Sequence, residues 1–308
     1  MALLIAPLGG GAAEWRRLFA AEMPGLEVRL FPEVGDVRDI EAAAVMRIPP
    51  GFLATLPRLK LIVSLLAGQE SLLADQTLPD VPIVRAGNPA GDPMMSETAL
   101  LHVLRHHRFL PDYALQQQRR QWQRQPLLKT AERKVGVMGL GQIGLPVAQY
   151  LAQHGFAVAG WSRTEKRAPG LALFAGPEQF PAFLARSEIL VDLLPATAET
   201  NNLIDRKVFR QLPKGAHFIN LARGAHVVDR DLLDALDADQ LAAATLDVFR
   251  EEPLPKESPF WAHPKITVIP HASRRHDPAD IVPRIAENLR RLARGAPLLQ
   301  PVDRRAGY

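Results

Sequence analysis

The chain has 308 residues, 47% of them hydrophobic, which is enough to bury a large core and suggests about two domains. The absence of cysteine excludes disulfides, thiolate zinc sites and cysteine-ligated iron–sulfur clusters. The net charge of +4 comes with arginines spread along the chain, so we expect anionic small molecules rather than nucleic acid as partners.

The amino-terminal segment is predicted to be a buried strand rather than a signal peptide. The apolar start Met1 to Leu8 has no basic region before it and breaks at Pro7 and at Gly9 to Gly11. No apolar run elsewhere approaches the roughly 18 residues that a membrane helix needs. We therefore expect a cytoplasmic protein with no membrane partner.

The first hundred residues show a weak alternation of apolar runs and amphipathic stretches. A helix from about Ser96 to Gln121 is predicted to follow this region, which contains no phosphate-binding loop. The expected strands are Ala2–Ala6, Glu27–Leu30, Leu61–Ser64 and Ile83–Val84.

From Lys134 onward the same alternation is stronger and is typical of a parallel sheet with crossover helices. Ile143–Gln153 and Asp229–Leu236 are the clearest helices, and a last helix at Pro278–Arg294 returns the chain to the first domain. The expected strands are Lys134–Gly139, Ala157–Trp161, Ile189–Leu194, His217–Leu221, Ala243–Phe249 and Ile266–Pro270.

These patterns predict an α/β protein with two domains. A Rossmann-type doubly wound parallel sheet is expected over residues 99–275 and would bind a dinucleotide. A discontinuous, flavodoxin-like α/β domain is expected over residues 1–98 and 276–308 and would bind the substrate.

A glycine-rich loop identifies the expected cofactor. Gly139-Leu140-Gly141-Gln142-Ile143-Gly144 follows the strand Val135–Met138 and opens a helix. The glycines lie where a tight turn and close approach to a pyrophosphate need them, and the helix amino terminus favours an anion. Since the 9 histidines show no metal-binding spacing such as His-Glu-x-x-His, we expect this organic cofactor and no metal.

The end of the next strand indicates which dinucleotide binds. An acidic residue there would bind the 2′-hydroxyl of NAD(H), but this chain has Trp161-Ser162-Arg163-Thr164. Arg163 can form charge-assisted hydrogen bonds to a 2′-phosphate, and Ser162 and Thr164 add hydroxyl donors. We therefore expect a preference for NADP(H), with use of NAD(H) possible.

Three residues have the chemistry that reduction of a 2-keto acid requires. The reaction needs a cation for the carboxylate, a donor to the carbonyl oxygen and an acid that works near neutral pH. Arg223, Glu252 and His271 each follow a predicted strand, at the edge where open α/β sheets bind ligands.

Several motifs, in one order over essentially the whole chain, resemble the D-isomer-specific 2-hydroxyacid dehydrogenase family, in the branch of glyoxylate and hydroxypyruvate reductases. The resemblance implies an NADPH-dependent enzyme that reduces a small 2-keto acid to the D-2-hydroxy acid and forms a homodimer. Its most specific motifs are the Gly139 loop, Leu194-Pro195-Ala196-Thr197, Asn220 to Gly224, Asp247 to Pro255, Pro270-His271 and Val302-Asp303-Arg304-Arg305-Ala306-Gly307-Tyr308.

The resemblance also implies roles for individual residues. Arg223 would bind the substrate carboxylate and carbonyl, and His271 would protonate the nascent alkoxide. Glu252 would hydrogen-bond the far nitrogen of His271 and fix its orientation. Asp247 would accept a hydrogen bond from the nicotinamide carboxamide. Leu194 and Pro195 would contact the cofactor.

The chain departs from the family at the loop that holds the substrate carboxylate. Many relatives have Gly-Ala-Gly-Val-Asp, whereas this chain has Leu66-Ala67-Gly68-Gln69-Glu70. Ala67 and Gly68 remain available for amide donation, while the lost first glycine and the polar Gln69 affect the size and polarity of this wall.

Three further cations, Arg47, Arg274 and Arg275, replace an aromatic and small residues of close relatives. Either they face solvent or a partner subunit, or Arg47 or Arg274 contacts a second anionic group on a larger substrate.

A regulator that senses nucleotides, of the corepressor type, is the alternative from another functional class. The complete set of Arg223, Glu252 and His271 favours an enzyme instead.

Overall fold

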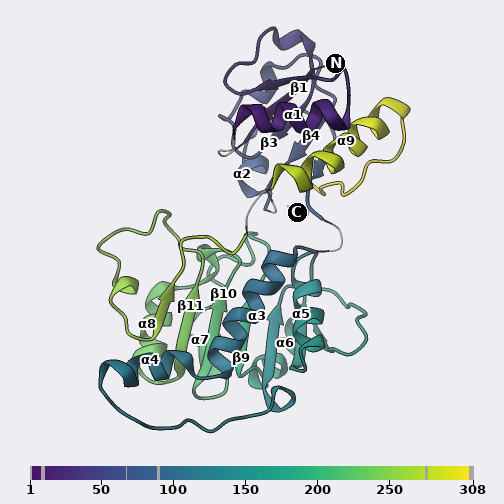
Figure 1. The fold of residues 1–308 in the computed structure, drawn as a ribbon. Coiled ribbons are helices and arrows are strands. Elements are labelled where there is room, and N and C mark those ends of the chain that lie inside the picture. Colours follow the sequence, from purple (N-terminus) through teal and green to yellow (C-terminus); the bar gives the residue numbers. More distant parts are fainter. Residues whose placement is uncertain (1, 8–10, 67, 89–90, 275–276, 305–308) are drawn as a thin grey trace. The chain divides into compact units, whose positions relative to one another are not determined.

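The computed structural model describes residues 2–7, 11–66, 68–88, 91–274 and 277–304, and it divides into two compact units (Figure 1). The first unit comprises residues 1–89 and 276–308, and the second comprises residues 90–275. The boundary between the units lies before the predicted one at residues 98 and 99, because helix α3 begins at Pro93 and packs into the core of the second unit. Each unit has its own sheet and its own core.

The first unit is built on a parallel five-stranded sheet in the order β2-β1-β3-β4-β5, which is the flavodoxin-like order. Its strands are β1 (Ala2–Ala6), β2 (Glu27–Leu30), β3 (Ile40–Val45), β4 (Leu61–Ser64) and β5 (Ile83–Arg85). Strand β3 was not among the expected strands. Its middle is a run of three alanines, a residue depleted in strands, yet Ala42 to Ala44 are fully buried at the centre of this sheet.

Alternate residues of these strands face two separate cores. Leu3 and Ile5 pack with α1 (Ala12–Glu22) and α9 (Pro278–Arg294), which cover one face. Leu4 packs on the other face, with η2 (Leu53–Thr55) among the elements that cover it. Helix α9 has the bounds that the sequence predicts, because Asp277 caps its start and Gly295, at φ 65°, ends it. The remaining short helices of this unit are η1 (Val37–Asp39) and α2 (Glu70–Leu73).

The second unit contains a parallel seven-stranded sheet in the order β12-β11-β10-β9-β6-β7-β8. This is the Rossmann strand order with one strand added at the β12 edge. The strands are β6 (Lys134–Met138), β7 (Ala157–Ser162), β8 (Ala172–Ala175), β9 (Ile189–Asp192), β10 (Ala216–Asn220), β11 (Leu241–Leu246) and β12 (Ile266–Val268). Strand β8 was also not expected, because this short, partly exposed edge strand lacks a clear apolar pattern.

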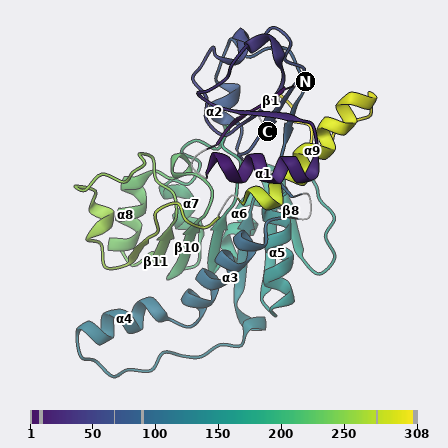
Figure 2. The ribbon, with the colours of Figure 1, turned by 45° about the horizontal axis from the view of Figure 1, so that its top comes forward.

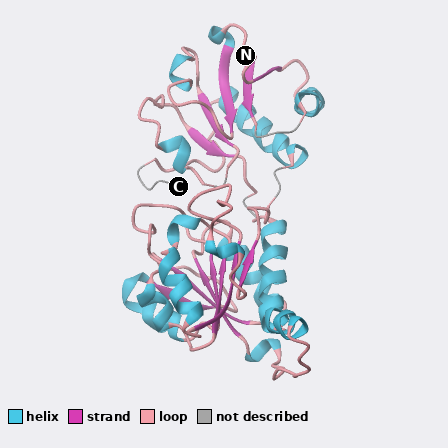
Figure 3. Cartoon of the chain, turned by 90° about the vertical axis from the view of Figure 1, so that its left-hand side faces the viewer, coloured by secondary structure: helices cyan, strands magenta, loops and turns pink. Residues whose placement is uncertain are grey.

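Helices cover both faces of this sheet (Figure 3). Helices α3 (Pro93–His107) and α5 (Gly144–Gln153) pack on one face, and α6 (Gly176–Ala185), α7 (Arg206–Gln211) and α8 (Asp229–Asp237) pack on the other. The strand order reverses between β6 and β9, so the loops after these two strands lead to opposite faces. That reversal opens a ligand-binding crevice at the carboxyl ends of the strands.

The predicted helix Ser96–Gln121 is two helices, α3 and α4 (Leu110–Gln118). Phe109 between them has φ 55°, and Pro111 lies in the first turn of α4, so the chain stops and restarts there. In Figure 2, α4 and the segment that follows it extend away from the sheet of the second unit. Short 3-10 turns at Thr130–Glu132 (η3), Gly224–His226 (η4) and Pro259–Trp261 (η5) complete this unit.

Candidate active site

The predicted site residues of the second unit lie in segments at the carboxyl ends of β6, β7, β9, β10, β11 and β12. Because all seven strands are parallel, these segments meet at one edge of the sheet. The topology thus gathers residues that are distant in sequence.

The glycine-rich loop is closely packed at its first and last glycines. Gly139 has φ +92°, and a Cβ atom there would lie 2.6 Å from the carbonyl oxygen of Leu193. A Cβ atom on Gly144 would lie 1.8 Å from the carbonyl oxygen of Gly139. Only glycine fits at either position without moving the backbone.

The middle of the loop leaves room for a ligand. Gly141 and Gln142 are exposed, and a Cβ atom on Gly141 would have no neighbour within 4 Å. Ile143, the residue before α5, gives no side-chain cap to the amides of the helix. Amides in the first turn of a helix have no partner within the helix, so they can donate to a pyrophosphate. The residues present therefore fit a dinucleotide.

The turn after β7 contains two side chains that hydrogen-bond to the backbone and two that are exposed. Trp161 Nε1 donates to the carbonyl oxygen of Gly176, and the Ser162 hydroxyl donates to that of Thr164 at 2.8 Å. Ser162 is 7% exposed, and its hydrogen bond to Thr164 stabilises the turn. Arg163 and Thr164 are exposed at the tip. Donation by Ser162 to a 2′-phosphate, which would redirect this hydroxyl, stays a prediction.

An acid that the sequence did not associate with this turn lies near Arg163. A hydrogen bond from the Thr197 hydroxyl lowers the pKa of Glu199, and the charge of Arg163 adds to this shift. Glu199 belongs to the segment after β9, which begins with the predicted cofactor residues Leu194 and Pro195. The charges of Arg163 and Glu199 therefore interact across the carboxyl edge of the sheet.

Arg223 is held in a tight turn at the end of β10. Asn220 is fully buried, accepts from the amide of Ala222 at 3.0 Å and donates to the carbonyl oxygen of Arg223 at 3.0 Å. The Arg223 side chain is half-buried, and its Nη1 donates to the carbonyl oxygen of Ala222 at 2.7 Å. A side-chain amide therefore fixes the backbone from which this guanidinium extends.

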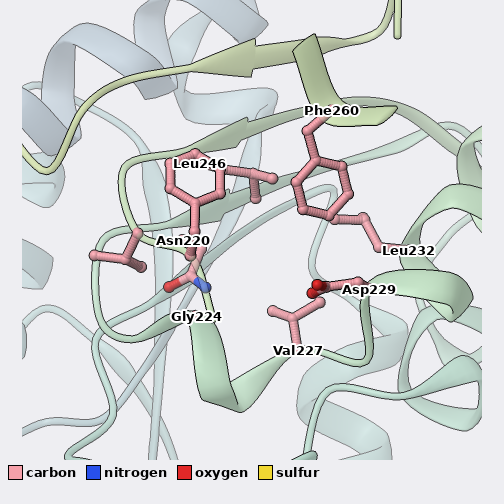
Figure 4. Close-up of a pocket in the computed structure, with 9 residues that line it drawn as sticks. Asn220, Gly224, Val227, Asp229, Leu232, Leu246 and Phe260 are labelled. Carbon is pink, nitrogen blue, oxygen red and sulfur yellow. The ribbon is translucent and has the colours of Figure 1, made fainter. Parts of the chain in front are cut away.

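Gly224 allows the Arg223 turn to pack on the segment after β11. A Cβ atom on Gly224 would lie 1.9 Å from the carbonyl carbon of Phe249. Beside this contact is a cavity of about 10 Å³, lined in part by Asn220, Asp229 and Phe260 (Figure 4). That is the space of about one water molecule, too small for a substrate. Burial raises the pKa of Asp229, and Arg250 opposes the shift.

His271 and Glu252 form the expected pair. His271 Nδ1 lies 2.7 Å from Glu252 Oε2, while Glu252 Oε1 accepts from the amide of Phe249 at 2.9 Å. The imidazole is 53% exposed, so Nε2 on its other side remains accessible. His271 also has φ 49°, an unusual backbone conformation for a residue with a Cβ atom, and such conformations gather at functional sites.

Asp247 holds the His271 segment rather than presenting a free carboxylate. It is 1% exposed, and its Oδ1 and Oδ2 accept from the amides of Ala272 at 2.7 Å and Ser273 at 3.3 Å. Its carbonyl oxygen accepts from the amide of His271 at 2.9 Å. Asp247 therefore sets the backbone of the His271 segment. Acceptance of a hydrogen bond from the nicotinamide carboxamide, the role that the resemblance implies, stays a prediction.

Two buried residues at this edge were missed by the sequence analysis. Asp192, at the end of β9, and His226, in η4, are fully buried, and Asp192 Oδ2 lies 2.7 Å from His226 Nδ1. No local pattern signals this pair, because the two side chains meet only through the β9–β10 pairing. A charged residue that ends an otherwise apolar strand was the one available clue.

The predicted substrate residues of the first unit follow β3 and β4. Arg47 is exposed and lines a cavity of about 160 Å³ together with Ser64, Gly68 and Ser71. Gln69 is 1% exposed, and its Nε2 donates to the carbonyl oxygen of Leu66 at 3.0 Å. The role of Gln69 in substrate binding stays a prediction. Ala67 lies outside the described residues.

Arg274 has a carboxylate partner. Its Nε lies 2.6 Å from Oδ2 of Asp92, the residue that caps α3, and its side chain is 20% exposed. This ion pair argues against the expectation that Arg274 contacts a second anionic group of a substrate. Arg275, like the end of the carboxy-terminal motif at 305–308, lies outside the described residues.

The described part of the chain contains neither a metal-binding cluster nor a membrane-spanning helix. No group of three or more His, Asp or Glu side chains is placed there to hold a metal ion. Within the same residues, no helix is both long and apolar enough to cross a membrane.

Comparisons with known proteins agree with this architecture. Residues 100–273 match the family model described as D-isomer specific 2-hydroxyacid dehydrogenase, NAD binding domain. The chain is 40% identical over 303 residues to glyoxylate/hydroxypyruvate reductase A of Serratia proteamaculans, covering 96% of each protein.

Solved structures are similar over the whole chain. A D-isomer specific 2-hydroxyacid dehydrogenase from Xanthobacter autotrophicus, in complex with NADPH and MES, is 42% identical with a TM-score of 0.96, and the match covers 100% of this chain and 99% of the other. An NADPH-dependent glyoxylate/hydroxypyruvate reductase from Sinorhizobium meliloti, in complex with NADP and sulfate, is 32% identical with a TM-score of 0.92 and full coverage of both chains. The chain therefore belongs to the D-isomer specific 2-hydroxyacid dehydrogenase family.

Proposed function

We propose that this protein reduces a small 2-keto acid, of the glyoxylate or hydroxypyruvate class, to the D-2-hydroxy acid with NADPH. The observation that carries the proposal is the His271–Glu252 pair, held at the same sheet edge as Arg223 and the Gly139 loop. The relatives named as glyoxylate/hydroxypyruvate reductases and the neighbours solved with NADPH or NADP support it.

NADPH, when bound, supplies the hydride for the keto carbon. Arg223 would donate to the substrate carboxylate and to the carbonyl oxygen, stabilising the charge that grows there. His271 would give that oxygen a proton from Nε2, while Glu252, on Nδ1, keeps the ring in position. Asp247 would act through the backbone of His271.

The direct test is NADPH oxidation by the purified protein with glyoxylate, hydroxypyruvate, pyruvate and oxaloacetate. We expect turnover with glyoxylate or hydroxypyruvate and a D-configured product where the product is chiral. Tight NADPH binding without oxidation by any 2-keto acid would contradict the proposal and favour the nucleotide-sensing alternative.

Arg163 is proposed to select NADPH over NADH. Replacing it with alanine is expected to lower kcat/KM with NADPH about tenfold and to leave NADH little changed, the low end for a charged hydrogen bond because Arg163 is exposed. Glu199→Gln removes a negative charge near Arg163, so it should have the opposite effect and raise the preference for NADPH slightly. Equal efficiency with the two cofactors in the wild type would contradict the proposal.

A second candidate, reduction of a dianionic 2-keto acid, is favoured by Arg47. Among the described residues nothing pairs with its guanidinium, which lines the same cavity as Gly68. We expect Arg47→Ala to lower kcat/KM for oxaloacetate about 2–5-fold relative to glyoxylate, a small effect because the side chain is exposed. Arg274→Ala, already paired with Asp92, is the control and should leave the ratio unchanged. If Arg47→Ala leaves the ratio of kcat/KM for oxaloacetate to that for glyoxylate unchanged, Arg47 does not bind a second carboxylate and this candidate function is contradicted.

We also propose that the active form is a homodimer formed through the α3–α4 region, with no nucleic acid partner. Large apolar side chains are exposed along one segment of the second unit: Leu101, Leu104, Leu110, Trp122 and Leu127. Trp122 is 94% exposed on the segment that extends from the sheet in Figure 2, and a second copy of the same segment would bury it.

Sedimentation tests the dimer. We expect the wild type to have twice the chain mass of 33.9 kDa, and a Leu110→Ser, Trp122→Ser double variant to shift toward the monomer. Trp261→Ser, which alters another exposed tryptophan of the same unit, should leave the mass unchanged. A monomeric wild type would contradict the proposal. A cytoplasmic location likewise remains a prediction.

A further inference from the structure

A buried carboxylate and imidazole connect two segments of the candidate site. Asp192 ends β9, His226 ends η4, and both side chains have 0% exposure. Asp192 Oδ2 lies 2.7 Å from His226 Nδ1. A carboxylate without solvent needs hydrogen-bond partners, so the imidazole strongly determines how Asp192 is oriented.

Asp192 holds the segment that begins with Leu194. Its second oxygen, Oδ1, accepts from the amide of Leu194 at 3.0 Å. Leu194 and Pro195 are the residues of this segment that are expected to contact the cofactor. Turning the Asp192 carboxylate would therefore release the amide that anchors this segment.

His226 holds the turn that carries Arg223. Its backbone amide donates to the carbonyl oxygen of Arg223 at 3.3 Å, and its own carbonyl oxygen accepts from the amide of Ile204 at 2.9 Å. The turn has little freedom on its other side, because Gly224 lies against Phe249. Displacement of the imidazole would thus move the backbone of Arg223.

We propose that Asp192 and His226 are positioning residues that align the Leu194 segment with the Arg223 guanidinium, so that one buried pair sets both cofactor and substrate binding. This inference rests on the proposed function. Neither side chain is required to touch a ligand, since each acts through the backbone that it holds.

The test compares His226→Leu, which removes the imidazole, with His226→Asn, whose amide can still donate to Asp192. We expect His226→Leu to raise the KM for glyoxylate by about tenfold or more and to weaken NADPH binding, because misplaced groups lose alignment with the substrate. His226→Asn should restore both constants to within about threefold of the wild type, since the hydrogen bond is kept.

His217→Leu is the matched control. His217 is 3% exposed and lies in the same strand pairing, but near the start of β10, away from the carboxyl edge. It should lower the Tm while leaving the KM and the Kd of NADPH unchanged. If His217→Leu changes the KM and the Kd of NADPH as much as His226→Leu does, both variants act through a general loss of stability, and the inference is wrong.

Asp192→Asn provides a second route if His226→Leu does not fold. The new side chain would keep an oxygen toward the amide of Leu194 and turn its NH₂ group toward His226 Nδ1. Because that NH₂ group donates, the imidazole proton would have to move to Nε2, which has no hydrogen-bond partner among the described residues. We expect a raised KM from this near-isosteric change. Wild-type constants in His226→Leu, or in Asp192→Asn where His226→Leu does not fold, would overturn the inference. An inactive wild type would instead defeat the proposed function, while the Kd of NADPH would still report on the pair.

Discussion

Replacing His271 with alanine is expected to lower kcat with glyoxylate by about 10²–10⁴-fold, the usual contribution of a general acid. The side chain is exposed and its Nδ1 is held by Glu252, so its loss removes a proton donor without opening the core. The Kd of NADPH should remain nearly unchanged. Steady-state rates and a fluorescence titration of NADPH measure the two quantities.

Two further variants make this prediction specific. Glu252→Gln keeps the shape of the partner and should lower kcat less than His271→Ala, since the proton donor is still present. His154→Ala removes an exposed imidazole at the end of α5, away from the strand ends, and should change nothing. A His271→Ala variant with kcat within about threefold of the wild type would exclude His271 as the general acid.

Alanine at Gly144 should lower the stability of the protein, whereas alanine at Gly141 should weaken NADPH binding. At Gly144 the new Cβ atom would lie 1.8 Å from the carbonyl oxygen of Gly139, which is itself confined by Leu193. Since only backbone could move, we expect a loss of at least about 1–3 kcal/mol in the free energy of unfolding. Thermal unfolding without ligand measures this as a lowered Tm.

At Gly141 the new Cβ atom would meet nothing within 4 Å, so the Tm of the free protein should stay as it is. NADPH binding should weaken by about tenfold or more, because the methyl group occupies the space through which the backbone approaches the pyrophosphate. Wild-type affinity in Gly141→Ala would mean that the cofactor does not lie on this loop. An unchanged Tm in Gly144→Ala would contradict the close packing.

The sequence predicts much of the fold because most strands and helices have clear periodic patterns. Helix α9 matches its expected bounds, and β6 is followed by the glycine loop and α5 as the motif requires. Strand β3 escaped prediction because its alanines are poor strand formers that only the surrounding sheet places in a strand. The break between α3 and α4 has one signal in the sequence, Pro111, which the predicted single helix ignored, while the positive φ of Phe109 cannot be read from the sequence.

Contacts between side chains of the site are predictable where the family resemblance supplies them. Glu252 and His271 meet as that resemblance implies, although they follow different strands. The orientation of Asp247 toward backbone amides, the pairing of Arg274 with Asp92 and the burial of Gln69 all depend on how side chains turn after folding. The Asp192–His226 pair joins residues from different strand ends, and no spacing rule connects them.

Transfer of a hydride from NADPH to the keto carbon can be followed with deuterium. The enzyme is incubated with glyoxylate or hydroxypyruvate and with NADPH deuterated, in separate reactions, at each of the two positions on the nicotinamide carbon that donates the hydride. We expect one of these cofactors to yield a 2-hydroxy acid with deuterium on the former keto carbon. Product without deuterium from either cofactor, or no product while NADPH binds, would contradict it.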